Sequence, residues 1–292
     1  MFLIADCGAT KCDWAISDGN ECVKTFTGAG FNPVHSKDDS IFAAIKNAVT
    51  ANEVSAKVIT DIFFYCAGCI DEISSDKVKG ALRYFFPDSR IETFDDLTAA
   101  GRAIFKTDNG IACILGTGCN AGVYTDMKIQ DHIPPLGYIL GDEGSGTSIG
   151  KRLINAIYKK ELPDEYREMF ERECMLNYDD VIYGVYRSDT PAVFLSSFMP
   201  FIHDHINDLT LRNLVLTEFD MFFNRNIIRL DRPKSYCVGF VGSVAVHFAD
   251  ILKDAARFHG ITISSIVQKP IQRLVEFHNE TPQQKKEQMN LN

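Results

Sequence analysis

Two short segments of the chain carry side chains that could bind and transfer a phosphate group. The first is "DCGATK" at residues 6–11, where an apolar run ends in an aspartate before a glycine turn. Such a turn presents backbone N–H groups and the Thr10 hydroxyl to phosphate oxygens, and a carboxylate at a strand end can hold Mg²⁺ through water. A simple turn would explain Gly8 but not an ionised Asp6 ending an apolar strand. We therefore predict that Asp6 binds a metal ion.

The second segment, "TFDDLTAAG" at residues 93–101, places two consecutive carboxylates at a predicted helix start. Phosphoryl transfer needs a group that accepts the proton of the attacking hydroxyl, and either Asp95 or Asp96 is suited to this. One of them is equally suited to be the N-cap of the helix. The two roles are compatible, and the pattern alone does not assign them.

A third segment, "GYILGDEGSGTSIGKR" at residues 137–152, is rich in glycine but is not a Walker-type phosphate loop. That loop requires a glycine where this chain has Ser145, and a Ser or Thr after the lysine where it has Arg152. Its glycines need another explanation.

The elements that must position these residues follow a duplicated order. Period-two alternation and glycine turns predict an antiparallel meander of three strands, then alternating helices and strands. The predicted elements of the first copy are strands "FLIADC", "CDWAIS", "ECVKTFT", "DIFFYC" and "IETF", and helices near 37–50, near 74–85 and from Asp96. Those of the second copy are strands "GIACILGTG", "AGVYTD", "KIQDH", "SYCVGFVG" and "ITISSIV", helices from 147 to about 230 and from Ser243, and a terminal helix "PIQRLVEFHN".

Within the long helical region, Phe219, Phe222 and Phe223 have the helical spacing of core residues. His203 and His205 are interpreted as packed or solvated side chains rather than metal ligands. The polar end of the chain, from about residue 279, is expected to fray.

Composition limits the class of protein. The 292 residues are 46% hydrophobic and 24% charged, which is typical of a folded globular chain. A net charge of −9 and a pI near 5.3 argue against nucleic-acid and anionic-membrane partners. The N-terminus lacks the basic region of a signal peptide and no apolar stretch is long enough for a membrane span, so we expect a cytoplasmic protein. Its nine cysteines are expected to be reduced, and the lone pair Cys66 and Cys69 is a weak metal or redox signal.

Taken in order, these motifs resemble the nucleotide-site elements of the sugar-kinase, actin and heat-shock-chaperone superfamily. They are Asp6-x-Gly8-x-Thr10-Lys11, "LGTG" at 115–118, "FDDLTAAG" and the late "VGFVGS". Within that superfamily, "GTGCNAG" followed by "LGDEGSG" resembles the N-acetylglucosamine kinase branch, also called the BadF/BadG/BcrA/BcrD ATPase family. The resemblance spans nearly the whole chain.

The resemblance implies an α/β fold of two ribonuclease H-like, actin-like ATPase domains with the active-site cleft between them, each a mixed five-stranded sheet with helices. It places the N-terminal domain at residues 1–97 plus the C-terminal helix at 269–292, and the second domain, with a helical insertion, at 98–268. It also implies ATP and Mg²⁺ as cofactors, an amino sugar as the small-molecule partner, and a homodimer, as in similar kinases.

It further implies a role for particular residues. Asp96 is the catalytic base, although Asp95 stands where the family usually has Asn, and Asp6 binds the metal. The residues implied in nucleotide binding are Gly8, Ala9, Thr10, Lys11, Gly116, Thr117, Gly118, Gly242 and Ser243. Those implied in sugar binding are Asn32, Asn120, Gly137 and Asp142, which accounts for the glycine-rich third segment. Cys119 replaces a common Ser, so a hydroxyl contact is missing there.

The function implied is ATP-dependent phosphorylation of a hydroxyl, the 6-hydroxyl, of N-acetylglucosamine or a related amino sugar. Two alternatives stay open. One is an ATP-hydrolysing activator of a dehydratase or reductase, for which only Cys66 and Cys69 are candidate iron–sulfur ligands. The other is a non-catalytic sugar or nucleotide sensor, which would need neither Asp6 nor Asp96. No motif identifies the sugar or the base of the nucleotide.

Overall fold

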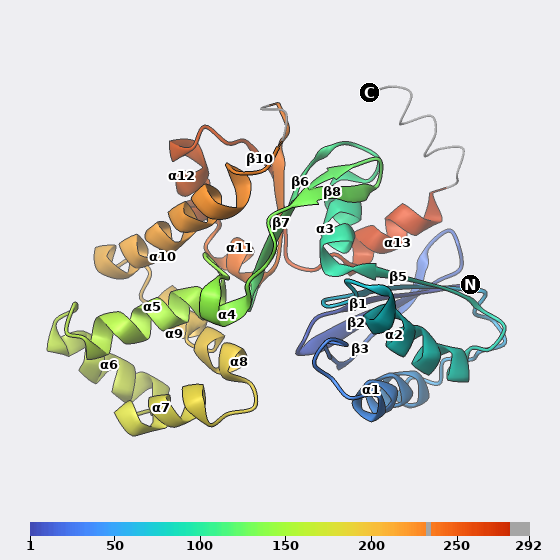
Figure 1. Ribbon diagram of the computed structural model, residues 1–292, viewed down its shortest axis with the longest axis horizontal. Helices are drawn as coiled ribbons and strands as arrows, with labels where there is room; N and C mark the ends of the chain where they lie inside the picture. Colours follow the sequence, from blue (N-terminus) through green and yellow to red (C-terminus); the bar gives the residue numbers. More distant parts are fainter. Residues whose placement is uncertain (232–234, 281–292) are drawn as a thin grey trace. The chain divides into compact units, whose positions relative to one another are not determined.

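The computed structural model describes residues 1–231 and 235–280, and the chain divides into two compact units. Unit 1 comprises Met1–Gly110, Tyr124–Ile129 and the chain from Lys269, and unit 2 comprises Ile111–Val123 and Gln130–Gln268. In each unit the sheet has five strands (Figure 1). Of the predicted tail, residues 281–292 lie outside the described residues, and Asn279 is the last residue of helix α13.

The sheet of unit 1 has the strand order β3-β2-β1-β4-β5. Its first three strands are antiparallel neighbours, whereas β4 and β5 run parallel to β1. The strand bounds are β1 Phe2–Cys7, β2 Lys11–Ser17, β3 Cys22–Ala29, β4 Asp61–Cys66 and β5 Arg90–Asp95. The meander and the two later strands predicted from the sequence are confirmed.

Two helices cover each face of this sheet (Figure 1): α1 (Asp38–Ala51) and α2 (Glu72–Phe85) on one, α3 (Asp96–Phe105) and α13 (Ile271–Asn279) on the other. Alternation along β1 determines the two cores, because successive side chains point to opposite faces. Leu3 and Ala5 pack toward α1 and α2, and Ile4 packs toward α3 and α13. The strand ends that carry Asp6 and Asp95 are therefore supported on both sides.

The sheet of unit 2 has the order β10-β9-β6-β7-β8 and supports one large core. Its strands are β6 Gly110–Leu115, β7 Cys119–Thr125, β8 Lys128–His132, β9 Val238–Val241 and β10 Ile263–Val267. Its helices are α4 Gly137–Leu140, α5 Gly146–Tyr158, α6 Asp164–Cys174, α7 Tyr178–Tyr186, α8 Pro191–Ser196, α9 Met199–Asp204, α10 Leu209–Phe222, α11 Ser243–His247, α12 Ala249–Phe258 and the π-helix η1 Phe223–Ile227.

The predicted core role of the phenylalanines in α10 and η1 is confirmed, because Phe219, Phe222 and Phe223 are fully buried. The helices predicted between 147 and about 230 are present, and Pro191 and Pro200 lie in the first turns of α8 and α9. The short helix α4 and the π-helical turn were not predicted.

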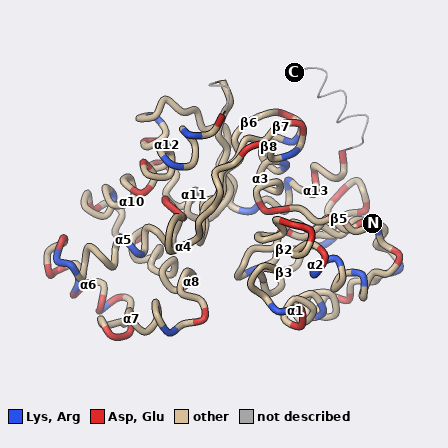
Figure 2. Tube along the Cα trace, in the orientation of Figure 1, with Lys and Arg blue, Asp and Glu red and all other residues tan. Residues whose placement is uncertain are grey.

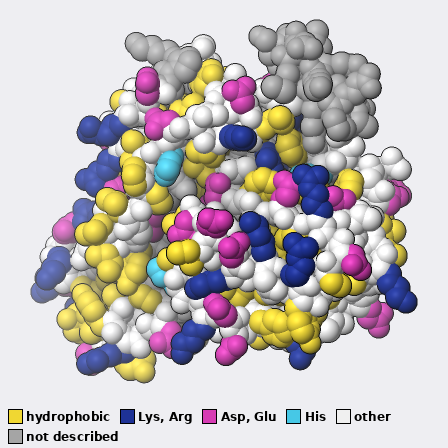
Figure 3. All heavy atoms as spheres, turned by 45° about the vertical axis from the view of Figure 1, so that its right-hand side comes forward, with side chains coloured by type: hydrophobic (Ala, Val, Ile, Leu, Met, Phe, Trp, Pro, Cys, Tyr) yellow, Lys and Arg dark blue, Asp and Glu magenta, His cyan; other side chains and the backbone are white. Residues whose placement is uncertain are grey.

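Charged side chains of both signs alternate along the traces of the two units (Figure 2). The face drawn in Figure 3 likewise mixes Lys and Arg with Asp and Glu rather than gathering one sign. No helix within residues 1–231 and 235–280 combines the length and apolar character that crossing a lipid bilayer requires.

Candidate active site

The metal-site candidate Asp6 lies at the end of β1 in unit 1, half-buried and next to the turn that follows the strand. Burial and, after it, the charges of Asp96, Cys7 and Asp13 together raise its pKa from 3.8 to about 7. All three neighbours named here are acidic groups, so the ionised carboxylate is electrostatically unfavourable as it stands. A divalent cation would relieve this, and Mg²⁺ commonly binds proteins through one or two carboxylates plus phosphate and water. Asp6 therefore fits the implied ion.

Two hydrogen bonds fix the turn after Asp6, one within the turn and one from Gly30, which directly follows β3. The Gly8 N–H donates to the Lys11 carbonyl (2.9 Å), and the Gly30 N–H donates to the Thr10 carbonyl (3.0 Å). A Cβ on Gly30 would lie 2.2 Å from the Gly8 oxygen and the Lys11 nitrogen, so only glycine permits this approach. The sequence analysis did not single out Gly30.

The two adjacent aspartates after β5 have different environments. Asp95 is the N-cap of α3, and its carboxylate accepts hydrogen bonds from the Thr98 N–H and the Thr98 hydroxyl, each at 2.7 Å. The pKa of Asp96 is raised from 3.8 to about 6, mainly by burial and then by the charge of Asp95, and the N–H groups of Leu97 and Asp96 partly oppose this rise. A carboxylate that titrates near neutrality is suited to accept a proton.

Asn32 follows β3 and lies against the loop after β4. Its side-chain oxygen accepts a hydrogen bond from the Val34 N–H (2.9 Å). A Cβ on Gly68 would lie 2.2 Å from that oxygen, and Gly68 has a φ of +96°. The position of Asn32 therefore depends on a glycine far away in the sequence.

In unit 2, the Gly116–Gly118 turn is fastened to the first turn of α5. The Gly146 N–H donates to the Gly116 carbonyl (2.8 Å), and the Thr147 hydroxyl donates to the Thr117 carbonyl (2.6 Å). Nearby, Gly242 has a φ of +127°, and a Cβ there would lie 2.2 Å from the Leu115 oxygen. Only glycine fits between β9 and α11 at this point.

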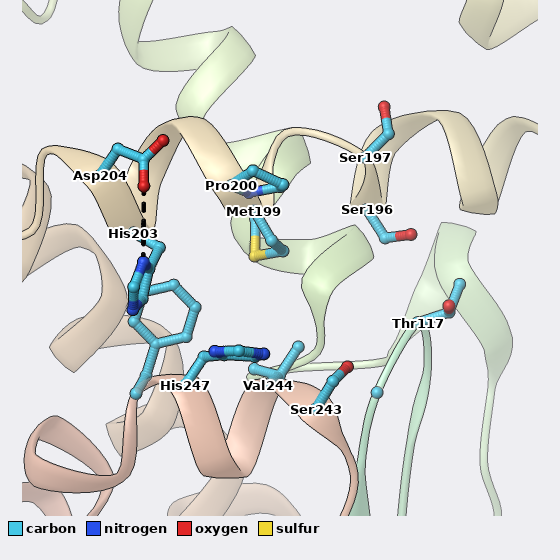
Figure 4. Close-up of a pocket in the computed structure, with 12 residues that line it drawn as sticks. Thr117, Ser196, Ser197, Met199, Pro200, His203, Asp204, Ser243, Val244 and His247 are labelled. Carbon is cyan, nitrogen blue, oxygen red and sulfur yellow. Dashed lines mark ion pairs between the residues drawn. The ribbon is translucent and has the colours of Figure 1, made fainter. Parts of the chain in front are cut away.

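A cavity of about 520 Å³ opens beside this turn, and we call it the large pocket (Figure 4). It contains three of the predicted nucleotide residues together with side chains of α8, α9 and α11. The lining residues are Gly116, Thr117, Ser196, Ser197, Met199, Pro200, His203, Asp204, Ser243, Val244, His247 and Phe248. Gly118 and Gly242 are not among its lining residues. His203, interpreted from the sequence as a packed or solvated side chain, lies in the wall of this pocket.

A smaller cavity of about 140 Å³, the small pocket, brings together two of the predicted sugar residues, Asn120 and Asp142. The Asp142 carboxylate accepts a hydrogen bond from the Cys119 N–H (3.3 Å). Burial raises the pKa of Asp142, and this hydrogen bond partly offsets the rise. Gly137 does not line the pocket, although Leu136 and Gly141 on either side of it do.

The cysteine pair of the sequence analysis belongs to a buried group of thiols. Cys7 is the register partner of Cys12 across β1 and β2, and of Cys66 across β1 and β4. Cys66 and Cys69 are both buried. Among the residues that the structure describes, no group of three or more His, Cys, Asp or Glu side chains has a geometry that could hold a metal ion.

Comparison with solved structures identifies the family. The crystal structure of the "putative N-acetylglucosamine kinase" of Porphyromonas gingivalis superimposes with a TM-score of 0.92, at 36% sequence identity, over 96% of this chain and 99% of that one. This chain belongs to the N-acetylglucosamine kinase family. No family model and no curated protein sequence matches it.

Structures with lower sequence identity share the fold. The "putative N-acetylglucosamine kinase" of Chromobacterium violaceum has a TM-score of 0.73 at 14% identity, covering 95% of this chain and 98% of that one. The ROK hexokinase of Thermus thermophilus has a TM-score of 0.51 at 13% identity, covering 94% and 97%. The predicted duplicated actin-like ATPase fold is confirmed, with one mixed five-stranded sheet in each unit.

Proposed function

We propose that this chain is an ATP-dependent kinase that phosphorylates the 6-hydroxyl of N-acetylglucosamine or a related amino sugar. Family membership supports a sugar kinase, and the observation that carries the chemistry is the environment of Asp96. Burial and the charge of Asp95 raise its pKa to about 6, and it does not cap the helix, because Asp95 is the N-cap of α3. A base whose pKa lies close to the working pH combines availability with proton affinity.

In this proposal the other residues bind and orient. Asp6 would hold Mg²⁺, which would supply positive charge for the phosphates. The turns at Gly8–Lys11 and Gly116–Gly118 donate backbone N–H groups to phosphate oxygens. The large pocket takes the nucleoside, whose base packs against apolar side chains of α9 and α11 such as Met199 and Val244. Asn32, Asn120 and Asp142 bind sugar hydroxyls and the acetamido group. Asp96 removes the proton of the attacking hydroxyl.

The proposal is tested by Mg²⁺-dependent ADP release from purified protein with a panel of acetamido sugars, amino sugars and plain hexoses. We expect turnover with an acetamido sugar and none with its 6-deoxy analogue. The Asp96→Asn variant should lose about 10²-fold to 10⁴-fold in kcat, the range typical of a lost general base. The matched Asp95→Asn variant should keep most of its turnover, because asparagine is also a good N-cap. ATP hydrolysis that ignores every sugar would refute the proposal.

A further inference from the structure

The end of α10 and the π-helical turn η1 contact the loop that carries Asp142. The Glu218 carboxylate of α10 accepts hydrogen bonds from the Ser148 hydroxyl (2.6 Å) and, more weakly, from the Gly144 N–H (3.4 Å). From η1, Arg225 donates to one oxygen of Glu143 (2.7 Å) and the Asn226 amide to the other (3.4 Å). The segment 218–226 therefore fixes the loop directly after Asp142.

The loop backbone has a shape that needs such support. Asp142 has a φ of +60° and Gly144 a φ of +75°, both in the left-handed region. A side chain other than glycine persists in that region when the surrounding structure holds it there. A Cβ on Gly144 would lie 2.9 Å from the Cβ of Phe222, so the loop backbone packs directly on α10.

The two consecutive side chains that contact the Glu143 carboxylate both belong to the π-helical turn. A π-helix closes its hydrogen bonds from i to i+5, so each turn holds more residues than a turn of α-helix, and such turns are frequent at functional sites. In η1, the Ile228 N–H donates to the Phe223 carbonyl (3.0 Å). Arg225 and Asn226 lie within this turn, and both line the small pocket with Asp142 and Glu143.

Charge makes Arg225 the decisive member of the group. Glu143 is only 8% exposed and is the immediate neighbour of Asp142, whose pKa it raises by like-charge repulsion. The Arg225 side chain is itself 56% exposed, but its removal would leave the buried Glu143 carboxylate without its cationic partner, which is costly. Without Arg225, the Glu143 carboxylate would be expected to move toward solvent and take the Asp142 backbone with it.

From these contacts we infer that Arg225 and Asn226, acting through Glu143, position Asp142 for the sugar and thereby determine sugar affinity. The inference rests on the proposed function. Arg225 and Asn226 are positioning residues, since they hold Glu143 rather than the reacting atoms.

The test compares the KM for the sugar with the KM for ATP. We expect Arg225→Ala to raise the KM for the sugar about tenfold or more, because small misplacements of a positioning group are costly. The KM for ATP should stay within about twofold, since the large and small pockets share no lining residue. The sugar KM of Arg225→Lys should lie between those of the wild type and Arg225→Ala, since lysine supplies the charge without the planar guanidinium group. Arg229→Ala is the matched control, because Arg229 is an exposed arginine one turn further along.

A double-mutant cycle then shows whether Arg225 acts through Glu143. In a Glu143→Gln background the buried charge is gone, so Arg225→Ala should raise the sugar KM by less than about twofold. Equal effects of Arg225→Ala in both backgrounds would overturn the inference, and so would an unchanged sugar KM in the single variant. Parallel losses for sugar and ATP, with a lowered Tm, would also overturn it. Wild-type protein that turns over no sugar would instead overturn the proposed function, and the inference with it.

Discussion

Replacing Asp96 with asparagine is predicted to stabilise the folded protein at neutral pH while it removes catalysis. The pKa of Asp96 rises from 3.8 to about 6 on folding, mainly through burial and then through the charge of Asp95. A carboxyl group with a raised pKa binds its proton more tightly in the folded chain, so stability falls as the pH rises from about 4 through 6. At about 1.4 kcal/mol for each pKa unit, the ionised group costs at most about 3 kcal/mol above pH 7. Asparagine has no charge to bury and avoids this cost.

Urea unfolding without nucleotide or divalent cation measures the effect. The free energy of unfolding of Asp96→Asn should exceed that of the wild type by an amount that is negligible well below pH 4 and reaches its plateau near pH 7. Between pH 5 and pH 7.5 the difference should grow by about 1.4 kcal/mol. Asp95→Ala is the control, and it should lower stability by about 1 kcal/mol because it removes the N-cap. A variant less stable than the wild type by the same amount at every pH would refute the reasoning.

Three further predictions concern activity. The kcat/KM of the wild type should rise with pH through about 6 and then level off, because Asp96 acts as the ionised base. Asp95→Ala should shift this rise to lower pH, because the charge of Asp95 raises the pKa of Asp96. A flat profile between pH 5 and 7 would contradict this prediction. Gly30→Ala should raise the KM for ATP at least about tenfold, because the added Cβ would displace the turn at Gly8–Lys11. Gly80→Ala is the control and should leave this KM unchanged, because the space around its Cβ is open. Met199→Ala should raise the KM for ATP by about tenfold, because it removes apolar contact with the nucleotide base. Met175→Ala is the control, because Met175 is exposed. An equal effect of the two variants would argue against the large pocket as the nucleoside site.

The order of elements was predictable because it is encoded locally. Short apolar runs predict β1 and β2, and Gly8 between them predicts the turn, whatever the rest of the chain does. The same holds for Asp95 and Asp96, where the helix start is visible in the sequence. The sequence left open which of the two is the cap, because this depends on which carboxylate faces Thr98.

Much of the candidate site was not predictable because its partners are distant in sequence. Glu143 and Arg225 are separated by 82 positions, and no local pattern couples them. In the sequence Gly30 resembles an ordinary turn glycine, and its hydrogen bond to the Thr10 carbonyl is visible only in the structure. Met199 and His203 have the spacing of packed helical residues, and only the opposing wall formed by α11 makes them part of a pocket.

The return of α13 to unit 1 has a consequence for how the protein is made. Ile271, Leu274 and Val275 cover the same face of the sheet as α3, packing with Ile4 and Tyr65 of β1 and β4. During synthesis, the strands of unit 1 leave the ribosome long before residues 271–279, and that part of the sheet stays uncovered until then. Apolar surface exposed in this way is where nascent chains aggregate. Unit 1 is therefore the first part of the protein to begin folding but cannot finish until the chain is translated past residue 279.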